Sequence, residues 1–262
     1  MKSMTRIRPA FFVLVLYLSG CGADISDRDR RQSDLRYANA YELWQNQHDI
    51  LGAIRNLVRA VELNPENADA YYLLGTIQLT RGEVAEAEKH LKEALRIREK
   101  FPEALNSLAV LYIHQKRYDE AEKLLTKAVE DIMYREPWIA RGNLGWCYIE
   151  QGRYEEAVEV LKRAVFDQPA FCLGYYRMGE AYYRLEKYPE AYENLVQSVS
   201  IEQSGCANLQ EAFRFLGLTA LKLNLAGEAM KHFQKCVELG QKTEIGRKCA
   251  VESGNPSGGA IR

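Results

Sequence analysis

Residues 108–128 read LAVLYIHQKRYDEAEKLLTKA, and the spacing of the small and apolar residues in this stretch recurs along the chain. Ala121 is followed by a leucine four residues later and an alanine seven residues later. A Leu-Ala pair stands 13 and 12 residues before it. Equivalent alanines recur at intervals of 34, 34, 36, 34 and 38 residues, at Ala53, Ala87, Ala121, Ala157, Ala191 and Ala229. Six copies in register predict a repeat protein in which each copy is one supersecondary unit.

The other recurring positions keep their size from copy to copy. Four residues after each alanine stands a large apolar residue, at Leu57, Leu91, Leu125, Leu161, Leu195 and Phe233. Twelve residues before it the residue is small in five of the six copies, at Gly75, Ala109, Gly145, Gly179 and Gly217, with Tyr41 in the first. Small residues let two antiparallel helices approach closely, and the large residue fills the gap between them. The pattern therefore predicts a series of antiparallel helix pairs.

This spacing resembles the tetratricopeptide repeat over residues 34–243. The resemblance implies an all-α fold, a right-handed superhelical solenoid of six helix-turn-helix repeats. We expect the repeats at 34–67, 68–101, 102–135, 138–171, 172–205 and 210–243. After them we expect a short closing segment and a disordered tail over residues 244–262.

The chain begins with a short apolar run that is typical of an export signal. Lys2, Arg6 and Arg8 precede the run at 10–18, and no acidic residue occurs before Asp24. A helix of nine residues is about 14 Å long, too short for a bilayer core of about 30 Å. A basic start and a short apolar run followed by small residues predict a secretory signal peptide over residues 1–20.

The predicted signal peptide ends at a cysteine. Leu18-Ser19-Gly20-Cys21 resembles a bacterial lipobox, in which the cysteine becomes the first residue of the mature chain and is acylated. The alternative is an ordinary signal peptide that happens to end near a cysteine. Because Gly22 and not Asp follows Cys21, the resemblance implies a lipid anchor in the bacterial outer membrane, facing the periplasm. Residues 21–33 would then be the lipidated cysteine and a polar tether.

Composition and motifs argue against nucleic-acid binding and against catalysis. The chain has 35 Lys and Arg and 36 Asp and Glu, and loss of residues 1–20 leaves 32 basic residues without a basic cluster. The histidines are isolated and lack metal-ligand spacing, and the usual zinc, esterase and phosphate-loop motifs do not occur. We therefore expect a non-enzyme without a cofactor, a metal, a nucleic-acid partner or a small-molecule substrate.

Five further cysteines follow Cys21. Cys147 stands where the repeat has a small buried residue, so we expect a core thiol there. Cys172 begins the first helix of the fifth repeat and Cys206 lies just beyond its second helix, and antiparallel helices bring those two ends together. Cys236 and Cys249 flank the turn around Gly240. Since disulfides persist after export, we predict Cys172–Cys206 and Cys236–Cys249 bridges; the alternative is that all five thiols are reduced and buried.

In tetratricopeptide solenoids the first helices line a concave groove, mainly through positions 2, 5, 9, 12 and 13 of each repeat. The resemblance implies a partner-binding groove lined by Tyr72, Leu79, Asn106, Val110, Ile113, Trp146, Ile149, Tyr176, Tyr183, Leu218 and Leu221. The fifth positions lack the lysine and asparagine clamp that some of these proteins use for a C-terminal carboxylate. An apolar strip rimmed by polar groups therefore suits an amphipathic or apolar segment of a protein partner.

A lipobox followed by six tetratricopeptide repeats resembles the type IV pilus pilotins, the PilF, PilW and Tgl family. The stretches 142–152, GNLGWCYIEQG, and 171–174, FCLG, are especially similar to Tgl. The resemblance implies an outer-membrane lipoprotein that helps secretin subunits of the pilus to assemble into a ring. The alternative is a periplasmic adaptor lipoprotein that recruits peptidoglycan-remodelling enzymes or other envelope complexes.

Overall fold

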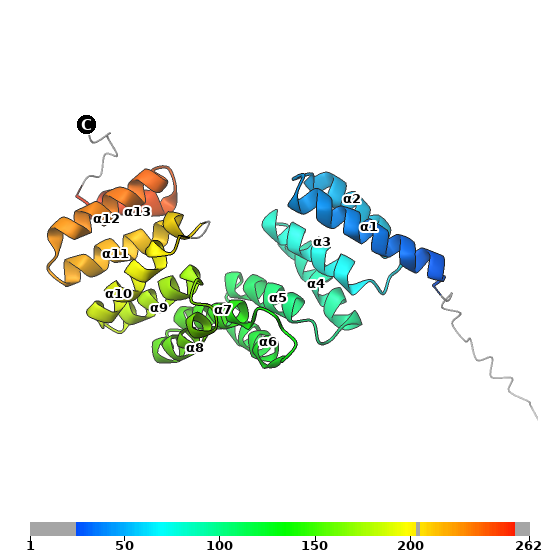
Figure 1. Ribbon diagram of the computed structural model, residues 1–262, viewed down its shortest axis with the longest axis horizontal. Coiled ribbons are helices and arrows are strands. Elements are labelled where there is room, and N and C mark those ends of the chain that lie inside the picture. The colour runs from blue at the N-terminus through cyan, green and yellow to red at the C-terminus, as the bar shows by residue number, and fades with distance from the viewer. Residues whose placement is uncertain (1–24, 203–204, 255–262) are drawn as a thin grey trace, which may run out of the picture.

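The computed structural model describes residues 25–202 and 205–254, which form an arch of antiparallel helix pairs (Figure 1). The described residues contain helices and no strands, so the predicted all-α solenoid is confirmed. Cys21, the predicted signal peptide and most of the predicted tail lie outside the described residues. The helices are α1 (Asp27–Gln45), α2 (Ile50–Leu63), α3 (Ala68–Thr80), α4 (Val84–Ile97), α5 (Pro102–His114), α6 (Tyr118–Glu130), α7 (Pro137–Glu150), α8 (Tyr154–Asp167), α9 (Cys172–Arg184), α10 (Tyr188–Ser200), the 3-10 turn η1 (Cys206–Asn208), α11 (Gln210–Lys222), α12 (Ala226–Leu239) and α13 (Glu244–Glu252).

The predicted polar tether is wrong over residues 27–33, which are the first two turns of α1. Ser26 caps this helix by accepting a hydrogen bond from the Asp29 N–H. Ser33 is fully buried, and its hydroxyl donates to the Ala60 carbonyl at 2.8 Å and accepts from Asn67 Nδ2 at 2.9 Å. Only Ser33 and Ala40 are buried along α1, so its sequence lacks the apolar periodicity that predicts a helix.

Four of the helix pairs are held by contact between a glycine on the first helix and a large apolar residue on the second, at Gly75, Gly145, Gly179 and Gly217. A Cβ atom on Gly145 would lie 2.5 Å from Leu161 Cγ, and one on Gly217 would lie 2.5 Å from Phe233 Cε1. Leu161 and Phe233 are fully buried. The glycines thus allow a helix approach that a methyl group would obstruct.

Stacked arginines connect successive repeats near the turns between paired helices. The Arg117 guanidinium lies 3.7 Å from the Tyr112 ring centroid and pairs with Glu88 of the preceding repeat at 3.1 Å. Arg153 repeats the arrangement one unit later, 4.2 Å from the Tyr148 ring and 2.6 Å from Glu122. The arginine planes cover aromatic faces while they satisfy carboxylates of a neighbouring repeat.

The predicted cysteine pairs are joined in the structure, and Cys147 is a buried free thiol. The Cα atoms of Cys172 and Cys206 are 5.7 Å apart, and those of Cys236 and Cys249 are 6.2 Å apart. The second bridge fastens α13 over the end of the sixth repeat. Gln210 supports the same turn by donating to the Cys236 and Gly240 carbonyls at 2.7 and 3.0 Å.

Two glycine substitutions of opposite effect test the helix contact. Gly145→Ala should destabilise the protein by about 1–3 kcal/mol because the new methyl group overlaps Leu161. Gly227→Ala in α12 meets no atom within 4 Å and should stabilise by about 0.4–1 kcal/mol. Urea unfolding followed by circular dichroism measures both, and equal shifts would contradict the proposed contact.

Non-reducing peptide mapping of the exported protein tests the two bridges. Closing the 34-residue separation between Cys172 and Cys206 should stabilise by about 3–4 kcal/mol, since it restricts the unfolded chain. We expect only Cys147 among the described cysteines to alkylate in denaturant without a reductant. Alkylation of all five would disprove the pairing.

Candidate functional site

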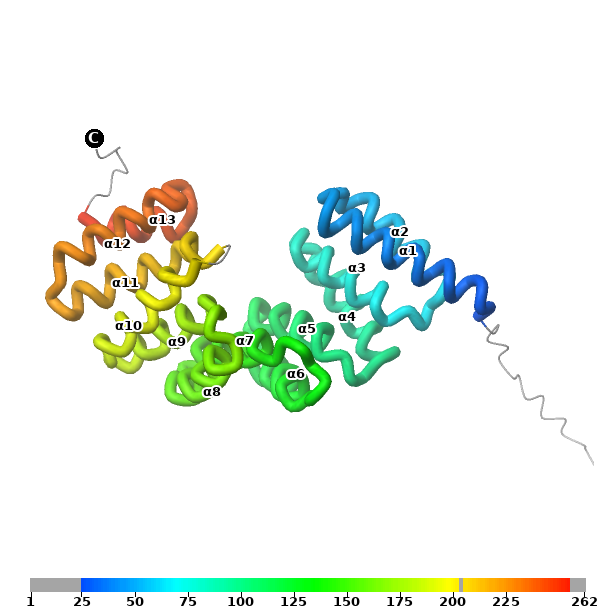
Figure 2. The backbone as a smooth tube through the Cα atoms, in the orientation of Figure 1, coloured from blue at the N-terminus to red at the C-terminus, as the bar shows by residue number. Residues whose placement is uncertain are grey.

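The inner surface of the arch is formed by the first helices of the repeats. In Figure 1, α5, α7 and α9 lie on the inner side, and their partners α6, α8 and α10 lie on the outer side. Figure 2 shows the same curvature as a continuous path from the first repeat to the last. Side chains of α5, α7 and α9 that are left out of the core therefore face the space that the arch encloses.

Two of the predicted groove residues are core residues, so their assignment to the groove is wrong. Ile113 is 3% exposed and packs in one cluster with Leu125 and Cys147. Ile149 is 6% exposed and packs with Leu161 and Met178. Both stand at the twelfth position of their repeats, where close packing against the next repeat covers the side chain. Sequence position alone does not reveal that covering.

The other predicted apolar residues differ in exposure. Tyr72, Leu79 and Leu218 are partly buried against core clusters, and the Tyr72 ring lies 5.0 Å from that of Phe101. Val110 is also partly buried, whereas Leu221 is 44% exposed. These residues border the inner surface without converging on one point.

Trp146 forms the aromatic centre of the middle repeats. Its ring lies edge-on to His114 with centroids 5.0 Å apart, and its Nε1 donates to Glu150 at 3.1 Å. The indole is held in place but keeps part of its surface exposed. A fixed, partly exposed indole is a common anchor for a protein partner.

Tyr176 and Tyr183 come together on Phe215 of the next repeat. The ring centroids lie 6.1 Å and 5.5 Å from that of Phe215, which is 6% exposed. Burial, reinforced by the nearby Glu180 carboxylate, raises the pKa of Tyr176, whose hydroxyl donates to Glu180 at 3.1 Å. Tyr176 and Tyr183 thus support the wall of the groove as well as lining it. Phe215 was not predicted, because it stands at a sixth position.

A hydrogen-bonded chain of polar side chains crosses from α5 to α9. Asn143 Nδ2 donates to Asn106 Oδ1 at 2.8 Å, and Arg177 Nη1 donates to Asn143 Oδ1 at 2.9 Å. An arginine can only donate, so Asn143 must present its oxygen to Arg177 and its amide to Asn106. Of these three residues, only Asn106 was predicted. Asn143 and Arg177 also stand at sixth positions, which the usual groove pattern omits.

Gly142 provides the space beside this chain. A Cβ atom there would lie 2.6 Å from Phe171 Cε1 and 3.5 Å from Arg177 Nη1. The Arg177 guanidinium lies 5.1 Å from the Trp146 ring centroid. Burial lowers the pKa of Arg177 to about 10, so the group stays protonated at neutral pH. The site therefore combines an aromatic face, two amides and a desolvated cation.

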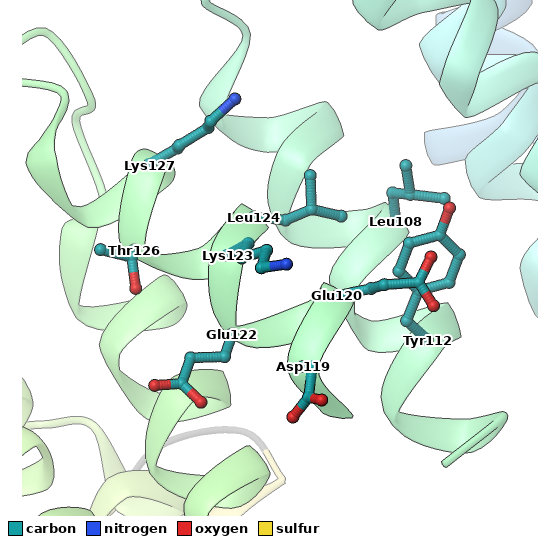
Figure 3. Close-up of a pocket in the computed structure, with 9 residues that line it drawn as sticks. All are labelled: Leu108, Tyr112, Asp119, Glu120, Glu122, Lys123, Leu124, Thr126 and Lys127. Carbon is teal, nitrogen blue, oxygen red and sulfur yellow. The ribbon is translucent and has the colours of Figure 1, made fainter. Parts of the chain in front are cut away.

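A cavity of about 800 Å³ lies along α6 instead of on the inner surface. Figure 3 shows its apolar residues Leu108 and Tyr112 on one side of α6, and Glu122 and Thr126 on the other. Glu122 is already paired with Arg153, and the neighbouring Glu120 with Arg117. Glu122 therefore serves a contact between repeats, and Glu120 serves a contact within its own repeat.

Residues 25–202 and 205–254 contain no group of three or more His, Cys, Asp or Glu side chains arranged to hold a metal ion. No helix in those ranges is long and apolar enough to cross a membrane.

Two substitutions distinguish a predicted groove residue that lies in the core from one that lies on the surface. Ile149→Ala should destabilise the protein by about 2–5 kcal/mol because it leaves a cavity between repeats. Leu221→Ala should change stability by less than about 0.5 kcal/mol, since its side chain is exposed. The shift in urea midpoint measures both effects, and a large loss for Leu221→Ala would contradict this description of the surface.

Comparisons with known proteins agree with the repeat architecture. Residues 37–100, 101–165 and 145–186 match the tetratricopeptide repeat family. A segment of 89 residues is 33% identical to the type IV pilus assembly protein PilF of Pseudomonas aeruginosa, and it spans 34% of this chain and 35% of that protein. The sequence match thus covers about a third of this relative's length.

Two solved structures share the fold over nearly their whole length. The crystal structure of PilW, described as a widely conserved type IV pilus biogenesis factor, matches with a TM-score of 0.72 at 21% identity. That match covers 82% of this chain and 97% of PilW. The structure of Pseudomonas aeruginosa PilF matches with a TM-score of 0.72 at 19% identity, over 86% of this chain and 99% of PilF. The chain is a PilF/PilW-like tetratricopeptide-repeat protein.

Proposed function

We propose that this chain is a type IV pilus biogenesis protein that assists the assembly of the pilus secretin at the outer membrane. The observation that carries the proposal is the shared fold, which extends over 97% of PilW and 99% of PilF. Two other solved structures match less completely: MamA has a TM-score of 0.53 over 68% of this chain, and the Cut9-Hcn1 complex has a TM-score of 0.73 over 87% of this chain but over only 44% of its own. PilW and PilF, by contrast, match over more than four fifths of this chain and nearly all of their own length.

The inner surface is the proposed docking site for the partner. Trp146 offers a fixed aromatic face, and Asn106, Asn143 and Arg177 offer hydrogen-bond donors beside it. Binding energy at protein interfaces concentrates in a few such aromatic and arginine residues. A segment of a secretin subunit held there would be kept from aggregating before the ring closes.

Lipidation at Cys21 is the proposed anchor. The sequence Leu18-Ser19-Gly20-Cys21 and the absence of Asp after the cysteine support delivery to the outer membrane. Several acyl chains bind a membrane far more firmly than one does. Tethering would hold the inner surface of the arch close to the membrane in which the ring must form.

Complementation of a deletion strain tests both parts of the proposal. Trp146→Ala should remove the docking anchor, which typically costs 2 kcal/mol or more of binding, about a thirtyfold loss of affinity. We expect this variant to fold and reach the outer membrane but to yield few heat-resistant secretin multimers and few pili. Trp146 is preferable to Tyr183 as a target, because loss of Tyr183 would also uncover Phe215.

Two further variants serve as controls. Phe166→Ala removes an aromatic residue that is 85% exposed at the end of α8 and should assemble secretin as the wild type does. Cys21→Ala should leave an unacylated protein that is absent from the outer-membrane fraction. Normal secretin multimers in a deletion strain would contradict the proposed role and favour the envelope-adaptor alternative.

A further inference from the structure

Arg177 is distinguished from the other arginines of the groove wall by its lack of a counter-ion. Arg184 pairs with Glu180 at 3.3 Å, and Arg214 forms a short ion pair with Glu252. Arg177 has no carboxylate oxygen within 4 Å in residues 25–202 and 205–254. Its one hydrogen-bonded partner there is the neutral amide of Asn143.

Most of the hydrogen-bonding capacity of Arg177 is unused. A guanidinium carries five N–H donors, of which the Asn143 oxygen accepts one. Every fully buried side-chain nitrogen or oxygen in the described part of the chain has a partner, so the remaining Arg177 nitrogens are not fully buried. The side chain as a whole is partly buried, and these donors keep some contact with solvent.

The surroundings of Arg177 favour an incoming anion over water. Burial lowers the pKa of the guanidinium, an effect that the nearby Tyr176 and Glu180 offset only in part. Trp146 covers one face of the group. The nearest negative group on the same helix, Glu180, accepts hydrogen bonds from Tyr176 and Arg184 and does not reach Arg177. Burial also raises the pKa of Glu180.

We propose that Arg177 is the receptor for a carboxylate of a peptide bound in the groove, with Asn106 beside it to hold the peptide backbone and Asn143 joining the two residues. A carboxylate matches the planar fork of a guanidinium and can accept two parallel hydrogen bonds. Asn106 Nδ2 has no partner within the described ranges and is available to a backbone carbonyl. The inference rests on the proposed docking of a protein segment in the groove, but not on the identity of that protein.

The position of Arg177 indicates an acidic side chain and not a chain end. Partly exposed aromatic side chains lie near it on two helices, with Trp146 on α7 and Tyr183 on α9, where Tyr183 packs on the buried Phe215 of α11. A peptide that contacts both aromatic side chains must continue past Arg177 in both directions. The ligand is therefore an extended segment with an internal Asp or Glu flanked by apolar residues.

A three-pool peptide experiment with the full chain in detergent tests this subsite. The first pool contains 11-residue peptides, acetylated and amidated, with Glu at the central position and mixed residues elsewhere. The second has Gln at that position, and the third has the same Gln but a free C-terminal carboxylate. Mass spectrometry identifies the retained peptides, and the intrinsic tryptophan fluorescence, to which Trp146 contributes along with Trp44 and Trp138, follows titration of the best Glu peptide and its Gln counterpart.

We expect the wild type to bind the Glu peptide at least about tenfold more tightly than the Gln peptide. Arg177→Gln should reduce that ratio to about one, because the carboxylate loses both hydrogen bonds. Arg184→Gln is the matched control and should keep the ratio, since Arg184 is already paired with Glu180. Arg177→Lys retains the charge without the fork and should give an intermediate ratio, which tests the subsite even if Arg177→Gln fails to fold.

Four results would overturn the proposal. They are equal binding of the Glu and Gln peptides by the wild type, a ratio that persists in both Arg177 variants, preferred retention of the pool with a free C-terminus, and retention of no pool. These results leave the secretin assay of the preceding section unaffected, so failure of the subsite is distinguishable from failure of the proposed function.

Discussion

The close approach of paired helices is the constraint on which the rest of the structure depends. It requires a residue with little or no side chain on the first helix opposite a large apolar residue on the second, as with Gly145 and Leu161. Helices in extensive contact belong to one repeat or to adjacent repeats, so the curvature of the whole array follows from this local contact. The inner surface exists because first helices consistently lie on one side of that contact. Trp146 and Arg177 are brought together from adjacent repeats in this way.

The fold could be predicted from the sequence because its determinants are small residues at a fixed period. The same reasoning did not predict the start of α1, because residues 27–33 are helical but contain almost no apolar residues. Ser33 and Asn67 replace apolar packing there by a buried hydrogen bond. A polar contact of this kind leaves no periodic signal in the sequence. The N-terminal boundary of α1 is therefore seen only in the structure.

The candidate site was predicted less completely than the fold. Trp146, Tyr176 and Tyr183 lie at standard groove positions, and the structure brings them to the inner surface or its wall. Ile113 and Ile149 occupy the same class of position but are covered by the following repeat. Asn143 and Arg177 were missed because they stand at sixth positions and are joined by a hydrogen bond between two repeats. A position-by-position pattern does not consider such a contact between neighbouring repeats.

The two disulfides make the molecule mechanically asymmetric. Both bridges lie between residues 172 and 249, whereas the first four repeats are held by non-covalent contacts between neighbours. In an array that is held by contacts between neighbours, the angle between repeats changes most easily where no covalent link joins them. The two bridges therefore restrict local opening of the fifth repeat and of the α12–α13 end, and α1 to α8 have no such covalent restriction.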